Sequence, residues 1–95
     1  MYIITISRRN PKTGELSTSA VGRIYSTHDD AENYMRFLYW IELKRYGLKD
    51  NDMLDSYGNA VPGGYHTQDT AGVYTYCDYA SGKLLEVATF VITSI

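Results

Sequence analysis

The sequence predicts a two-layer α+β domain in which one long helix packs across one face of a four-stranded, mainly antiparallel sheet. Three observations lead to this fold. Residues 27–46 carry a complete set of helix signals, hairpin patterns occupy residues 2–25 and 73–95, and 95 residues make one domain. The expected order is therefore ββαββ within a single domain, residues 1–95, whose far sheet face is open.

The central helix has recognisable signals at both ends. Thr27 can accept a hydrogen bond from a free amide of the first turn, and Asp30 follows three residues later in an Asp variant of the capping box. Gly47 suits the left-handed position that ends many helices, and Leu48 can then contact Leu43, as in a Schellman motif. We therefore expect the helix to begin at Thr27 and to end just before Gly47.

The helix carries more apolar side chains than one buried face requires. At about 100° per residue, five of them form one stripe that should face the sheet. These are Ala31, Tyr34, Met35, Leu38 and Ile41. Phe37, Trp40 and Leu43 point the other way, and a short chain has little material with which to cover them.

Two interpretations of this surplus remain open. The segment after the helix folds back over the second apolar face, or that face contacts another protein or a second copy. Aromatic residues, Met and Arg are enriched at the centres of protein interfaces. The predicted partner interface consists of Phe37, Trp40, Leu43, Arg36 and Tyr39.

The hairpins are predicted from alternating strand residues on either side of glycine-containing turns. Residues 2–8 and 15–25 form the first pair of strands, and 73–79 and 84–95 form the second. Between helix and second hairpin, residues 48–72 are rich in turn formers, and loops of this length tend to be functional, mobile or to contain a short element.

The open sheet face is a second candidate contact surface. Tyrosine combines a large apolar ring with a polar hydroxyl, which suits binding surfaces, and the chain has ten tyrosines. Tyr74 and Tyr76 alternate with Asp78 on one face of the third predicted strand. The predicted surface consists of Tyr74, Tyr76, Asp78, Tyr65 and His66.

Composition excludes several classes of function. The net charge is −2 and the basic residues are scattered, so the clustered basic footprint of a nucleic-acid-binding protein is missing. Cys77 is the only cysteine, which prevents an intramolecular disulfide and favours a reducing compartment. Neither a signal peptide nor a run of ~18 apolar residues is recognisable. We expect a cytoplasmic protein without membrane contact.

The sequence gives little support for catalysis. His28 and His66 are far apart in the chain, and no phosphate-binding, dinucleotide-binding or metalloprotease motif is present. We therefore expect no catalytic residues, metal or cofactor. The leading hypothesis is a non-catalytic, self-associating protein-binding module, in the style of the small inhibitors and adaptors that phages and other mobile elements use against host enzymes. The alternative is a small-molecule or nucleotide-binding domain or minor enzyme that uses residues 58–72, with His66 and Asp69 as polar groups.

Overall fold

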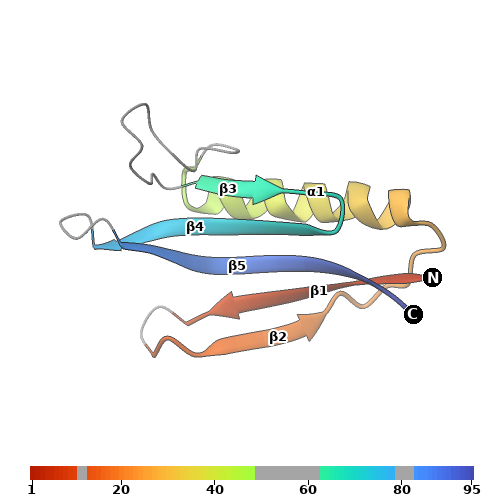
Figure 1. The fold of residues 1–95 in the computed structure, drawn as a ribbon, viewed down its shortest axis with the longest axis horizontal. Helices are drawn as coiled ribbons and strands as arrows, with labels where there is room; N and C mark the ends of the chain where they lie inside the picture. Colours follow the sequence, from red (N-terminus) through yellow and green to blue (C-terminus); the bar gives the residue numbers. More distant parts are fainter. Residues whose placement is uncertain (11–12, 49–62, 79–82) are drawn as a thin grey trace.

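One helix packs against one antiparallel sheet (Figure 1). The computed structural model describes residues 1–10, 13–48, 63–78 and 83–95. The sheet runs in the order β2-β1-β5-β4-β3, with every neighbouring pair antiparallel. In chain order the elements of these ranges are β1 (Tyr2–Arg9), β2 (Leu16–Ala20), α1 (His28–Arg45), β3 (Gly63–His66), β4 (Thr70–Asp78) and β5 (Lys83–Ser94). The predicted α+β class is confirmed, and the sheet has five strands where four were expected.

The last strand of the chain lies at the centre of the sheet. β5 pairs with β1 from Tyr2 opposite Ser94 to Arg8 opposite Ala88, and its other edge pairs with β4. The two hairpins predicted from the sequence are therefore joined side by side, because β1, the first strand of the first hairpin, pairs with β5, the second strand of the second. Both ends of the chain lie on the same side of the molecule (Figure 1).

The ends of α1 form as the sequence predicts. Thr27 Oγ1 accepts a hydrogen bond from the Asp30 amide at 3.2 Å, and Gly47 has a φ of 67°. The amide of Leu48 donates to the carbonyl of Leu43 at 2.9 Å, and the amide of Gly47 donates to the next carbonyl along. These two bonds make a full Schellman motif and satisfy carbonyls that the helix leaves free.

The fifth strand lies inside the segment predicted as a loop. β3 begins with two glycines, which are weak strand formers, and its four residues are too short for an alternating pattern. It pairs with β4, with Gly64 opposite Val73 and Tyr65 opposite Gly72. Residues 49–62 of the expected loop lie outside the described residues.

The buried face of α1 differs from the predicted stripe. Its buried residues are Ala31, Met35, Tyr39, Glu42 and Leu43. Tyr34 and Ile41, which the prediction placed against the sheet, are 36% and 39% exposed. The helix is therefore rotated about its axis relative to the expectation, and this rotation decides which side chains reach solvent.

Two contacts explain the rotation. A Cβ atom at Gly64 would lie 2.5 Å from Tyr39 Oη, so the tyrosine occupies the space that a side chain on β3 would otherwise fill. Glu42 is 2% exposed, and its Oε1 accepts hydrogen bonds from Arg8 Nε at 3.1 Å and Nη2 at 2.6 Å. A buried carboxylate needs such a partner, because its desolvation is otherwise costly.

The helix covers four of the five strands. It contacts β1, β3, β4 and β5, while every residue of β2 is exposed. The core between the two layers is centred on Phe90, Ile4, Met35 and Val73. The edge strand β2 consequently extends the sheet beyond the area that the helix covers.

Replacement of Gly64 by alanine tests the packing of Tyr39. The added methyl would also lie 2.7 Å from the Gly72 carbonyl oxygen, which is backbone and cannot move aside. We expect the free energy of unfolding to fall by about 1–3 kcal/mol, as for other overpacked positions, in urea titrations.

Gly22→Ala is the matched control, because a Cβ at Gly22 meets nothing within 4 Å. Its free energy of unfolding should stay within about 0.5 kcal/mol of the original protein. Equal effects of the two alanines would contradict the close approach of Tyr39 to β3.

Candidate functional site

Large apolar side chains gather on the side of α1 that faces away from the sheet. Phe37 and Trp40 are 51% and 52% exposed, and the partly exposed Tyr34 and Ile41 adjoin them. Their spacing of three and four residues places them next to one another on the helix surface. We call these four residues the outer helix face. Single exposed apolar residues are common, but an adjacent set of this size points to a contact surface.

Two residues of the predicted partner interface belong to the core instead. Leu43 is 2% exposed and Tyr39 is 3% exposed, so neither is available to a partner. Leu43 packs under the Schellman turn, and Tyr39 packs on Gly64. Arg36 is exposed as expected, and its Nε donates to His66 Nε2 at 3.3 Å.

The exposed rings are supported by their neighbours. Lys44 Nζ lies 3.7 Å from the centroid of the Trp40 ring, which is close enough for a cation–π interaction. The rings of Tyr34 and Phe37 lie 6.0 Å apart at a tilt of 39°. Because the helix backbone is rigid and these contacts limit ring rotation, the outer helix face loses little side-chain freedom on binding.

A groove continues the outer helix face toward the start of α1. It has a volume of about 470 Å³, and Tyr34 and Phe37 form one wall while Arg23 and Tyr25 form the other. The Arg23 guanidinium lies 5.6 Å from the Tyr25 ring centroid. The Tyr25 hydroxyl is buried and has no hydrogen-bond partner among the described residues, and burial raises its pKa. No pattern in the sequence indicates this groove, because its walls come from the helix and from an irregular segment.

The second predicted surface is only partly assembled on the open side of the sheet. Tyr65 and Tyr74 lie together there, with ring centroids 5.8 Å apart, and a Cβ at Gly72 would collide with the Tyr65 ring. His66 lies on the opposite face, because it pairs with the fully buried Ala71 on the helix side. The side chains of Tyr76 and Asp78 fall outside what the structure describes.

Burial and a carboxylate perturb one tyrosine of the open face. Burial, followed by the hydrogen bond and negative charge of Glu86, raises the pKa of Tyr74 to about 12. Burial also raises the pKa of Tyr65, and the charge of Glu86 adds to this. Both hydroxyls are therefore neutral hydrogen-bonding groups at neutral pH, and neither is an activated acid or nucleophile.

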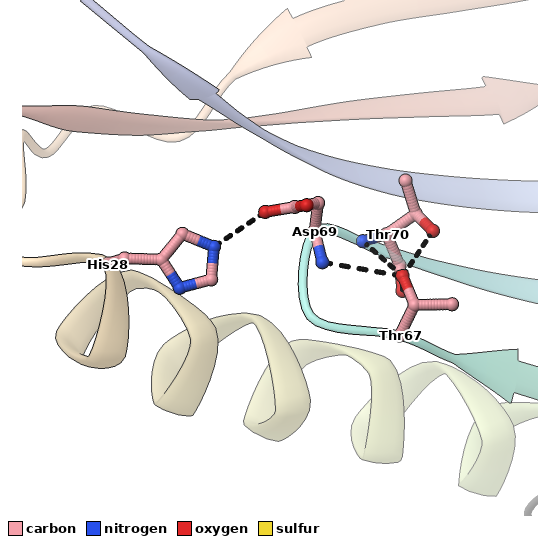
Figure 2. A network of polar contacts seen from close by, with 4 residues as sticks. All are labelled: His28, Thr67, Asp69 and Thr70. Carbon is pink, nitrogen blue, oxygen red and sulfur yellow. Dashed lines mark hydrogen bonds and ion pairs between the residues drawn. The ribbon is translucent and has the colours of Figure 1, made fainter.

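The first histidine forms a pair that the sequence did not predict. His28 Nε2 lies 2.6 Å from Asp69 Oδ1, although 41 positions separate the two residues (Figure 2). Thr67 Oγ1 accepts hydrogen bonds from the amides of Asp69 and Thr70 at 3.3 and 3.0 Å, which fixes the turn that carries Asp69. The Tyr2 ring meets the imidazole edge-on at 5.5 Å. The pair therefore fastens the start of α1 to the β3–β4 turn.

The polar groups of the alternative hypothesis do not form one site around Asp69. His66 lies beside Arg36 and near the Tyr39 ring, at 6.2 Å between centroids, whereas Asp69 pairs with His28. Within the ranges that the structure describes, no three His, Cys, Asp or Glu side chains are gathered in a way that could hold a metal ion.

Comparison with protein-family models, curated proteins and solved structures finds no significant match to this chain. In the described part of the chain, no helix has the length and apolar character needed to cross a membrane.

The raised pKa of Tyr74 predicts a pH dependence of stability. Below pH 10 the tyrosine is protonated in both the folded and the unfolded chain, and its contribution to stability is fully present. Between pH 10 and about 12 the unfolded chain loses this proton first, so the folded state becomes less stable as pH rises. Tyr74→Phe should flatten this part of the curve of unfolding free energy against pH, measured by urea titration.

Glu86→Gln provides the second arm of this experiment. It removes the negative charge, so the pKa of Tyr74 should move back toward 10 while burial still keeps it raised. Absorbance titration of the phenolate should show this shift. An unchanged alkaline slope in Tyr74→Phe would contradict the assignment.

Proposed function

We propose that the protein is a non-catalytic protein-binding module and that it contacts another protein through the outer helix face. The observation that carries this proposal is the adjacent exposure of Phe37 and Trp40 on the side of α1 opposite the core. The proposal no longer includes Tyr39 and Leu43 as contact residues, because both are buried.

The two aromatic rings would supply much of the binding free energy. Each aromatic side chain offers roughly 150–250 Å² of surface, and about half of it is exposed here. Covering both would contribute on the order of 5 kcal/mol before the costs of association. Rigid aromatic anchors of this kind often dominate binding energy at protein interfaces, and Arg36 at the edge supplies a polar group suited to an interface rim.

The shape of the site favours a macromolecular partner over a small ligand. The two rings project from a convex helix, which cannot enclose a small molecule, whereas a groove or flat surface of another protein can cover them. The neighbouring groove with the Tyr25 hydroxyl extends the same surface and can receive a partner side chain.

The size, charge and motif content of the sequence suggest the class of partner. A small acidic protein without recognisable catalytic motifs fits an inhibitor or adaptor, of the kind that phages and mobile elements direct against host defence enzymes. The lone Cys77 favours a reducing compartment such as the cytoplasm as its setting. We also propose that the protein self-associates, but through a surface other than the outer helix face.

Trp40→Asp is the most direct test. It places a charge on the outer helix face without touching the core, so we expect a normal circular dichroism spectrum. Partner capture by the tagged protein in an extract of its native host should fall at least tenfold, since a buried unpaired charge costs several kcal/mol.

Ile95→Asp is the matched control, because Ile95 is 62% exposed and lies outside the outer helix face. This variant should capture the partner as the original protein does. Retention of the partner by Trp40→Asp, together with its loss in His66→Ala, would contradict the proposed surface and favour the alternative site around β3.

A further inference from the structure

Among the described residues, no element covers the outer edge of β2. β2 lies at one end of the sheet, all five of its residues are exposed, and α1 does not contact it. Proteins usually protect such edges with charged side chains, proline, bulges or covering elements. The sequence of β2, LSTSA, contains no charge and no proline, and the ladder with β1 runs without a bulge.

The register of the sheet shows which backbone groups face outward. The amide of Val21 donates to the Ile4 carbonyl at 2.8 Å, and the Glu15 carbonyl accepts from Asn10 at 2.7 Å, at the two ends of the β1–β2 ladder. Hydrogen-bonded positions alternate along an antiparallel strand. Every second residue from Glu15 to Val21 therefore bonds to β1. The outward-facing amides and carbonyls belong to Leu16, Thr18 and Ala20.

These outward groups complement a second copy of the same strand. If two β2 strands pair antiparallel about a two-fold axis at Thr18, each Thr18 faces its counterpart and each Leu16 faces Ala20 of the second copy. All three outward amides and all three outward carbonyls of each strand then find partners, in six hydrogen bonds. Registers displaced by two residues leave some of these groups unpaired, so the strand specifies one arrangement.

The side chains and flanking charges fit the same arrangement. Leu16 meets Ala20 and Thr18 meets Thr18, so apolar residues and hydroxyls pair with their own kind. Glu15 precedes β2 and Arg23 follows it, so an antiparallel pair brings opposite charges toward each other at both ends. A parallel pair would bring like charges together.

We propose that the protein forms a two-fold symmetric dimer by pairing β2 of one copy with β2 of another. The axis is perpendicular to the sheet, so the two sheets become continuous and both helices lie on the same side. The outer helix face remains free in this dimer. The inference therefore stands independently of the proposed function, and either can fail without the other.

Charged substitutions of Thr18, the residue at the two-fold axis, test this dimer. Five residues per strand make a small contact, so dimerisation is expected to be weak and is best followed by analytical ultracentrifugation between about 10 μM and 1 mM. Thr18→Lys and Thr18→Glu should each weaken dimerisation at least tenfold, because like charges face each other across the axis. An equal mixture of the two variants should dimerise again.

Two controls separate this site from others. Ser94→Lys adds a charge at an exposed position near the opposite end of the chain and should leave dimerisation unchanged. Trp40→Asp should also leave dimerisation unchanged.

Amide hydrogen exchange of Leu16, Thr18 and Ala20 should slow as the protein concentration rises. A monomer at 1 mM, a dimer lost in Trp40→Asp, or a Lys–Glu mixture that stays monomeric would each overturn the proposal.

Discussion

The packing of Tyr39 against Gly64 determines how α1 is rotated on the sheet. A side chain at this glycine would occupy the place of the tyrosine ring, so the contact exists only because β3 is built from glycine at that point. With Tyr39 turned inward, Phe37 and Trp40 are turned outward, since they lie two positions before it and one position after it, about 200° and 100° around the helix. The same rotation leaves Tyr34 and Ile41 partly exposed beside Phe37 and Trp40, so a small residue on a neighbouring strand enlarges the exposed apolar surface.

The ion pair of Glu42 reinforces the same rotation. Its carboxylate is buried and is held by Arg8 from β1, while Arg45 approaches the same oxygen at 3.4 Å. Within the part of the chain that the structure describes, the second oxygen, Oε2, has no hydrogen-bond partner. Such a pair adds little net stability, but a rotation that separated the carboxylate from Arg8 while keeping it buried would leave its charge unpaired. Tyr39 and Glu42 therefore act together, one through shape and one through charge.

Local signals in the sequence predicted the local structure well. The caps of α1, the Schellman turn, the hairpin around residues 10–14 and the exposure of Phe37 and Trp40 all follow from patterns within a few residues. The strand β3, the burial of Tyr39 and the His28–Asp69 pair depend on residues far apart in the chain, and no short pattern encodes them. The missed strand also explains the misplaced helix face, because the glycines that accommodate Tyr39 were interpreted as loop.

The central place of β5 affects when the protein can fold during synthesis. This strand links β1 to β4, yet it is the last of the described strands to be synthesised, and its pairing with β1 joins residues far apart in the sequence. Until it emerges, the first hairpin and the helix have no common sheet to pack on, and the side chains that later surround Phe90 stay in contact with water. The sheet therefore cannot form until β5 has been synthesised, and such long-range pairing slows the search for the native state.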